Sequence, residues 1–255
     1  MVFSLEFPPI SHLLEWQEIW FAGTPFAISK IVLINIAATV IILGFMFYVG
    51  RRSSLVPTGA QNVGESVVDF VKDNIVLQTM GPSGLAWVPF FTLMFLFIFL
   101  NNIVKVIPPI LMPANGRLAG PLVLALTVYV IWNFLGIKHQ GLFGYFKNCL
   151  FPPGLPKALY VLVTPIEFIS TFLIRPFSHT VRLFANMLAG HILLATFAIL
   201  TASLWALEPY VVLVPLPFGM LIGVWLFEAL ASFLQAFIFT ILSAVYIGGA
   251  IHPEH

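Results

Sequence analysis

An arginine lies inside an apolar segment that is long enough to cross a membrane. Residues 178–191 read Ser-His-Thr-Val-Arg-Leu-Phe-Ala-Asn-Met-Leu-Ala-Gly-His, and the arginine is Arg182. Arginine does not lose its proton in proteins. Holding it at mid-bilayer depth costs roughly 3 kcal/mol on insertion scales and about 10 kcal/mol or more in simulations. A charge kept there at such a cost predicts a functional site.

Further polar residues occur on the two apolar runs at the C-terminal end of the chain. They are Glu167, Arg175, His179, Arg182, Asn186 and His191 on the first run, and Glu228, Ser232, Gln235 and Tyr246 on the second. At 100° per residue, Asn186 lies about 40° from Arg182, whereas His191 falls on the opposite side of the helix. The polar residues of the second run each lie within about 40° of Glu228. Proton donors and acceptors in a stripe beside a fixed cation suit proton passage through a barrier.

Structural roles remain open for each of these residues. Arg182 could pair with a carbonyl or carboxylate between helices, and Glu228 with Gln235 could form a polar clamp between helices. His191 could be buried and only hydrogen-bonded, while Glu167 could neutralise Arg175 or lie at the interface. Arg175 and His179 are expected near the cytoplasmic interface, where long polar side chains reach toward water, and neither is assigned to the site.

The composition predicts an integral membrane protein. The chain is 60% hydrophobic and 8% charged, whereas soluble domains carry roughly 25% charged residues. The apolar stretches are long and continuous, which favours helices over a barrel. A net charge of +1 gives no indication of nucleic-acid binding, and Cys149 is the only cysteine, which excludes an intrachain disulfide. No motif for nucleotide binding, nucleophilic catalysis or zinc is present, so we expect no cofactor, no metal and no bond-making chemistry.

The apolar runs predict one all-α membrane domain over 1–255 with five transmembrane helices and one interfacial helix. The expected elements are an extracytoplasmic segment (1–25), a first helix (26–50), an amphipathic helix in the interface (60–80), two spans (86–108 and 118–138) and a hairpin (159–201 and 209–251). A polar loop is expected over 138–156. Each arm of the hairpin has roughly 40 residues and would be about 60 Å long as a straight helix, twice the hydrocarbon thickness. Both arms must therefore tilt strongly or bend.

The distribution of basic residues predicts the orientation. With the N-terminus outside, the cytoplasmic loops hold Arg51, Arg52, Lys72, Lys138, Lys147 and Lys157, and the outer loops hold only Lys105 and Arg117. Because basic residues are enriched on the cytoplasmic side, this arrangement is favoured, and residues 252–255 are expected in the cytoplasm.

Several motifs together resemble subunit a of F-type ATP synthases. The signature is Arg182-Leu-Phe-x-Asn186-Met-x-Ala-Gly190-His191. It is accompanied by Val56-Pro57-x-Gly59-x-Gln61, Asn102 with Pro108, Pro165-Ile166-Glu167-x-Ile169-Ser170, Arg175-Pro176, and Leu234-Gln235-Ala236-Phe237-Ile238-Phe239. The resemblance extends over most of the chain, and its general pattern is bacterial.

The resemblance implies a proton-conducting stator subunit in the plasma membrane of a bacterium. It implies two aqueous half-channels, a rotating ring of c subunits whose carboxylate meets Arg182, and peripheral-stalk b subunits as further partners. Glu167, His191, Glu228 and Gln235 would belong to the proton path, with Asn186 beside the arginine. Two departures from the family pattern stand out, namely Asn115-Gly116-Arg117 where many relatives have an acidic residue, and a longer spacing from Arg182 to Gln235.

Two other classes of protein compete with this interpretation. A secondary transporter for a small anion would use Arg182 to hold its substrate, but the sequence contains no internal repeat of the kind that builds many transporters. A purely structural membrane anchor would tolerate replacement of Arg182. Whether the ion is a proton or sodium is not decided by this chain.

Overall fold

The computed structural model describes residues 18–20, 27–51, 58–107, 116, 118–151, 156, 159–206 and 210–251. Predictions for most of the N-terminal segment, Arg52, the Val56-Pro57 motif, Arg117, Lys157 and the C-terminal residues 252–255 lie outside these ranges. Five helical stretches in the described part are long and apolar enough to cross a membrane. They are Lys30–Arg51, Ala60–Val106, Ala119–Gln140, Tyr160–Trp205 and Tyr210–Ile251. The prediction of an all-α membrane protein is confirmed.

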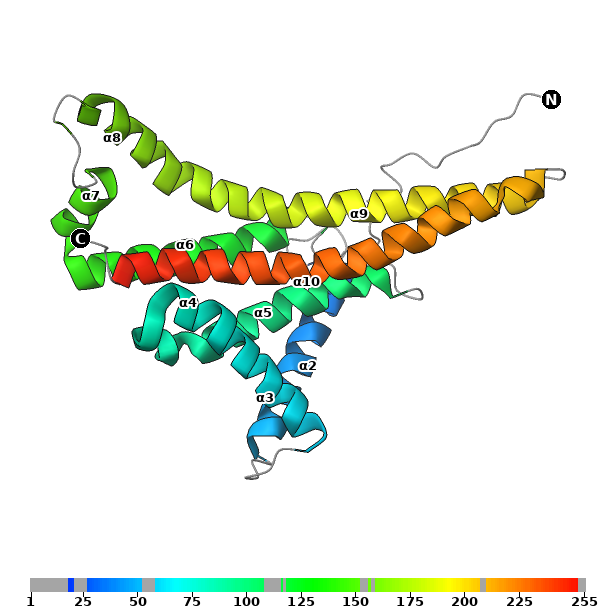
Figure 1. Cartoon of the computed structure of the whole chain (residues 1–255), viewed down its shortest axis with the longest axis horizontal. Coiled ribbons are helices and arrows are strands. Elements are labelled where there is room, and N and C mark those ends of the chain that lie inside the picture. Colours follow the sequence, from blue (N-terminus) through cyan, green and yellow to red (C-terminus); the bar gives the residue numbers. More distant parts are fainter. Residues whose placement is uncertain are drawn as a thin grey trace.

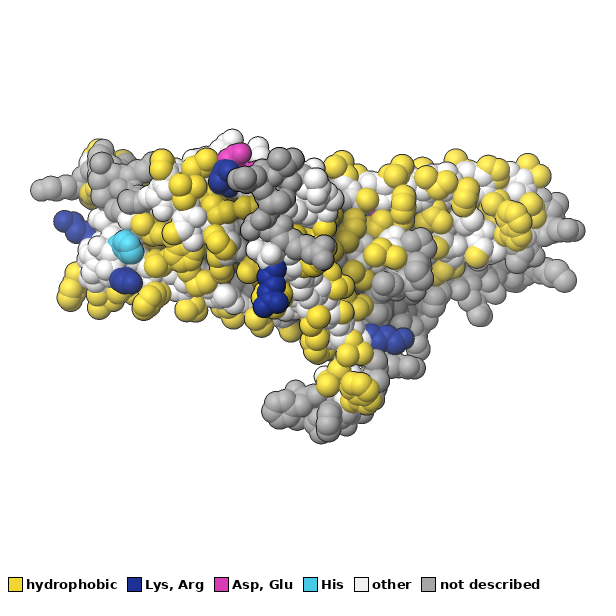
Figure 2. Space-filling model, turned by 90° about the horizontal axis from the view of Figure 1, so that it is seen from below, with side chains coloured by type: hydrophobic (Ala, Val, Ile, Leu, Met, Phe, Trp, Pro, Cys, Tyr) yellow, Lys and Arg dark blue, Asp and Glu magenta, His cyan; other side chains and the backbone are white. Residues whose placement is uncertain are grey.

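Within the described ranges, the exception to the helical architecture is one short pair of strands. β1 (Glu18–Trp20) pairs antiparallel with β2 (Ile28–Ser29) just before the first helix, α2 (Lys30–Arg51). Most side chains of α2 are exposed, and Ile31, Ala38 and Ile42 form its buried side. An apolar helix that is mostly exposed within its own chain is suited to contact with lipid. Figure 2 shows the same character on one face of the molecule, which is largely hydrophobic with few, scattered charges.

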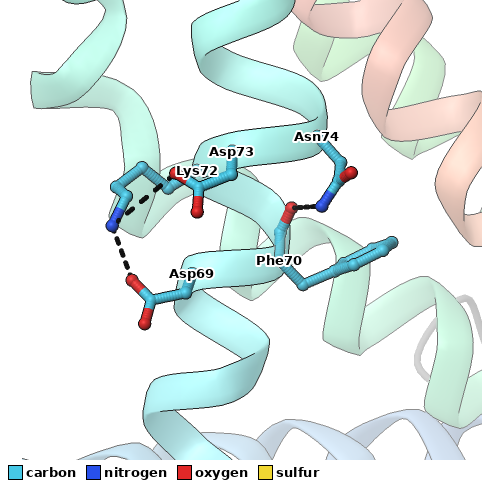
Figure 3. A network of polar contacts seen from close by, with 5 residues as sticks. All are labelled: Asp69, Phe70, Lys72, Asp73 and Asn74. Carbon is cyan, nitrogen blue, oxygen red and sulfur yellow. Dashed lines mark hydrogen bonds and ion pairs between the residues drawn. The ribbon is translucent and has the colours of Figure 1, made fainter.

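The amphipathic segment is built from several short helical pieces. They are α3 (Ala60–Val71), a π-helix η1 (Lys72–Val76), α4 (Leu77–Met80) and a 3-10 helix η2 (Gly81–Trp87), which leads into α5 (Val88–Ile103) and η3 (Val104–Val106). Gly81 has a φ of 64°, a conformation that favours glycine, and it lies where α4 ends and η2 begins. Val71 and Ile75 are fully buried, whereas Asp69 and Asp73 are exposed. The exposed face carries Lys72, whose Nζ lies 2.6 Å from Asp69 and 3.7 Å from Asp73 (Figure 3).

The long hairpin dominates the shape of the molecule. Its first arm comprises α8 (Tyr160–Ile169), a π-helix η5 (Ser170–Ile174) and α9 (Arg175–Ala206), and its second arm comprises η6 (Tyr210–Leu213) and α10 (Pro215–Ile251). α9 lies along α10, while α8 curves away from α10 toward α7 (Leu142–Leu150) (Figure 1). Pro165 lies inside α8, and both a proline and a π-turn are recognised causes of helix bending.

The core lies where α10 packs against α5 and α6 (Ala119–Gln140). Aromatic rings join α3, α5 and α10, since Phe70 lies 5.7 Å from Phe95 and Phe95 lies 5.8 Å from Phe233 between ring centroids. Phe91, Ile98, Phe239 and Ile247 are almost completely buried in the same cluster. This packing holds the C-terminal half of α10 in place.

The loop predicted over 138–156 is wrong, because α6 continues to Gln140 and α7 follows after Gly141. Tyr145 of α7 is buried, and its ring covers Gly136 of α6. The Tyr145 hydroxyl accepts a hydrogen bond from Trp132 Nε1 at 2.9 Å and donates one to Asn133 at 3.0 Å. Burial raises the pKa of the Tyr145 phenol above its usual range. Six of the nine residues of α7 are hydrophobic, and the packing of Tyr145 on α6 stabilises this short helix.

Candidate functional site

The polar stripe predicted on the last run is buried on α10. Glu228, Ser232 and Gln235 recur at spacings of four and three residues, so they share one face of the helix. All three are less than 9% exposed. The Ser232 hydroxyl shares its hydrogen between the carbonyl of Glu228 at 2.7 Å and that of Asn102 at 3.2 Å. The second contact ties this face of α10 to the end of α5.

Lys105 forms a buried ion pair with Glu228. Its side chain is completely buried, and that of Glu228 is 4% exposed. The prediction that Lys105 is a charge of an outer loop is therefore wrong. Lys105 follows Asn101 by four residues, so the helical continuation through η3 turns it to the same side, toward α10. Trp225 of α10 fastens this segment by donating its indole N–H to the Val106 carbonyl at 2.6 Å.

Gly190 of α9 completes the surroundings of Glu228. A Cβ placed on Gly190 would overlap the Glu228 carboxylate, so the carboxylate in its present position occupies the space that a larger residue at position 190 would take. We call Asn102, Lys105, Gly190, Glu228 and Ser232 the Glu228 cluster. It joins three segments that lie far apart in the sequence, namely the end of α5, the middle of α9 and the first half of α10.

Several buried amide atoms near these helices have no hydrogen-bond partner among the described residues. They are Asn101 Oδ1, Asn102 Nδ2 and Oδ1, Asn186 Nδ2 and Gln235 Nε2. Buried polar atoms in proteins are almost always bonded to protein or to ordered water. These side chains therefore offer binding positions for water along α5, α9 and α10.

Arg182 is exposed on α9 and makes no ion pair with any described residue. Its neighbour Leu183 is fully buried, as is Met187, so the arginine lies beside the face that packs inward. Asn186 follows one turn later and is half-buried. The predicted pairing of charge and amide on one side of the helix fits this arrangement.

The antiparallel register of the hairpin brings Arg182 level with Gln235. His179 lies against Phe239, with ring centroids 4.2 Å apart, and Gly190 lies against Glu228. The two contacts are eleven residues apart on each helix. Because both helices rise about 1.5 Å per residue, position 182 of α9 faces the level of positions 235–236 of α10.

The remaining predicted residues occupy different places. His191 follows Gly190 directly and is half-buried. Glu167 is half-buried on α8, and the π-helix η5 separates it from α9. It lies close enough to Cys149 of α7 to interact with it electrostatically. Glu167 is therefore not part of the Glu228 cluster.

His179 is buried, and the prediction that it lies at the interface is wrong. Its side chain is 4% exposed, and Nε2 lies 3.2 Å from the Ser243 hydroxyl. The ring packs on Phe239 and lies 5.6 Å from Tyr246, whose own ring is 5.3 Å from the Arg175 guanidinium carbon. We call Arg175, His179, Phe239, Ser243 and Tyr246 the His179 cluster.

No part of this arrangement resembles a metal centre. Within the described ranges, no group of three or more His, Cys, Asp or Glu side chains gathers where it could hold an ion. The functional chemistry available is proton exchange at Glu228 and at the imidazoles, hydrogen bonding by the amides, and the fixed charge of Arg182.

Comparison with known proteins agrees with the resemblance of the motifs. The sequence matches the family described as "ATP synthase A chain" over residues 32–248. It is 39% identical to ATP synthase subunit a of Rhodococcus erythropolis strain PR4 over 240 residues, which cover 90% of this chain and 85% of that protein. It is 38% identical to the same subunit of Parafrankia sp. strain EAN1pec, over 96% of this chain and 83% of that protein. The subunit of Frankia alni strain ACN14a is also 38% identical, over 94% and 84%.

Proposed function

The chain belongs to the ATP synthase A chain family, a membrane subunit of that enzyme, and from this premise we propose that it is the proton-conducting stator subunit a. It would form two aqueous half-channels against a ring of c subunits. Proton flow through them would drive rotation of the ring and thereby ATP synthesis. The chain itself would make and break no bond of the nucleotide.

The observation that carries the proposal is the separation of two charges on the hairpin. Arg182 is an exposed cation on α9, whereas Glu228 is an acid enclosed between α5, α9 and α10. Charges at membrane depth usually pair with another charge or face a water-filled cavity, and no carboxylate of the described residues pairs with Arg182. A carboxylate of the c ring would supply the pairing charge, and an opposite charge within several ångström keeps a carboxyl ionised.

The path residues would divide between the two sides of Arg182. Glu228 would exchange protons inside its cluster, and His191 of α9 would be the next group on the proton path. Gln235 and Asn186, with buried amide atoms at or near the level of the arginine, would hold water beside it. Glu167, beyond the π-helix, would serve the opposite mouth of the path. The fixed charge of Arg182 would prevent protons from passing straight between the two sides.

The setting follows the same reasoning. We expect the subunit in a bacterial plasma membrane, with its N-terminus outside, its C-terminus in the cytoplasm, and b subunits of the peripheral stalk beside it. Each proton that crosses such a membrane releases about 2.3 kcal/mol per 100 mV of potential. The long hairpin would form the surface that contacts the ring, where this free energy drives rotation.

The test is ATP-driven acidification of inverted membrane vesicles that carry Arg182→Ala. We expect the complex to assemble and pumping to fall below one tenth of the wild-type rate, because the ring carboxylate loses its counter-ion. Arg51→Ala is the matched control, since it removes an exposed arginine from the end of α2 and should leave pumping unchanged.

Two results would contradict the proposal. Pumping at the wild-type rate in assembled Arg182→Ala complexes would leave only a structural anchor. Uptake of a small anion by the isolated subunit, abolished by Arg182→Ala, would instead support a transporter.

A further inference from the structure

We propose that Lys105 is a working residue of the proton path, as the counter-ion that keeps Glu228 a carboxylate. This inference rests on the proposed function, because it gives Glu228 a role in proton transfer. The pair of residues, rather than the acid alone, would then be the unit that receives and releases the proton.

The burial of Lys105 excludes its usual role at a membrane surface. Lysines near helix ends normally extend their ammonium group toward water, but this side chain has no exposed surface. A lysine taken out of water without a partner loses several kcal/mol of hydration. Glu228 is the one carboxylate paired with it among the described residues, so each charge depends on the other.

The structure holds this pair in place from three sides. Trp225 fixes the backbone next to Lys105 through the Val106 carbonyl, and Ser232 fixes Asn102 one turn earlier. Gly190 lets α9 close over the carboxylate.

The pair also defines how a proton passes. A hydrated proton on one side protonates a Glu228 oxygen and leaves a neutral water, and the carboxyl then gives a proton to a water on the other side, which carries it away as a hydrated proton. The cluster returns to its starting charge, and Lys105 keeps its own protons throughout. The amide groups of Asn101 and Asn102, which have unpartnered buried atoms, can bind the water that solvates Lys105 while Glu228 is neutral.

The test measures passive proton conduction per assembled complex in vesicles stripped of the nucleotide-hydrolysing part. Lys105→Met removes the charge with a side chain of similar length, and Lys105→Gln is a second neutral variant with an N–H donor for Glu228. We expect both to conduct at least tenfold more slowly. Lys105→Arg keeps the charge and should recover at least one third of the wild-type rate. Lys138→Met, an exposed lysine at the end of α6, is the matched control.

Infrared spectroscopy of the purified complex gives a readout that does not depend on conduction. A carboxyl that loses its cation in an apolar site takes up a proton. We expect a band of a protonated carboxyl in Lys105→Met that is absent from the wild type and from the double variant Lys105→Met/Glu228→Gln. Wild-type conduction in either neutral variant, or the absence of the band in both, overturns the inference.

The failure of the proposed function gives a different result. If Glu228→Gln conducts like the wild type, Glu228 is not on the proton path, whatever the charge state of the pair. If Glu228→Gln blocks conduction while Lys105→Met does not, the path assignment holds and only the role of Lys105 is lost.

Discussion

The Glu228 cluster and the His179 cluster lie on the same two helices and have opposite characters. Both fill the seam between α9 and α10, on either side of Arg182 along the helix. The first encloses a full ion pair, whereas the second encloses an imidazole among aromatic rings with a serine hydroxyl as its polar contact. The hairpin alone does not decide this difference.

The difference between the two clusters comes from the third element that packs against each of them. At Glu228 the closing element is the end of α5, which contributes Lys105 and the Asn102 carbonyl. At His179 it is α6, which contributes Trp132, whose ring lies 5.0 Å from that of Tyr246. Under the proposed function, the charged partner would make the Glu228 cluster a site of proton exchange, whereas the aromatic partner would make the His179 cluster a packing contact. The following variants test that distinction.

Gly190→Ala should have the largest effect. The new Cβ overlaps the Glu228 carboxylate, so α9 must move away or the ion pair must rearrange, at a cost of about 1–3 kcal/mol in stability. We expect a tenfold or greater loss of conduction per complex, measured in vesicles. Gly223→Ala on α10 meets no atom within 4 Å and serves as control. Equal behaviour of the two variants would show that close approach at Glu228 is unimportant.

Trp225→Phe should have an intermediate effect. It removes the indole donor to the Val106 carbonyl and costs about 1 kcal/mol, which frees the segment that carries Lys105. We expect a two- to fivefold loss of conduction and a lower thermal unfolding temperature of the complex. Trp205→Phe changes an exposed tryptophan of α9 and should leave both quantities unchanged. If Trp225→Phe lost stability without any loss of conduction, the position of Lys105 would not matter for proton conduction.

His179→Phe should affect conduction by less than twofold. The phenyl ring replaces the imidazole against Phe239. The polar contacts of the imidazole with the Ser243 hydroxyl and the Phe239 backbone are lost, which costs about 1 kcal/mol of stability for each hydrogen bond. His179→Ala, which leaves a cavity, should cost more. A tenfold loss of conduction in assembled His179→Phe complexes would make this cluster part of the proton path and remove the contrast with Glu228.

Asp69→Asn should have the smallest effect. It weakens the exposed ion pair with Lys72 on α3 and η1 (Figure 3), and exposed ion pairs contribute little to stability because water and salt screen them. Thermal unfolding of the variant at low and high salt should differ little from the wild type. If Asp69→Asn lowered the thermal unfolding temperature as much as Lys105→Met does, burial would not govern the strength of ion pairs in this protein.

The sequence predicted the positions of those polar residues whose placement follows from helical spacing. The polar stripe of α10 and the neighbourhood of Arg182 and Asn186 depend only on 100° per residue and on the length of an apolar run. The burial of Lys105 was not predicted, because a lysine between an Asn-Asn pair and Pro108 resembles the end of a span. Its four-residue spacing from Asn101 was the available signal. The burial of His179 was not predicted, because it depends on the register of α9 against α10, which no local sequence pattern contains.

The π-helix η5 fixes the angular phase of the first arm of the hairpin. A π-turn contains one residue more than an α-turn, and η5 lies between Glu167 and Arg182. Removing one residue from it would turn α8 by about 100° relative to α9, while α9 stays held by α10. Glu167 would then point in a different direction, although its distance from Arg182 along the chain would change by only one residue. One extra residue therefore sets the direction in which the acid of α8 points relative to the arginine of α9.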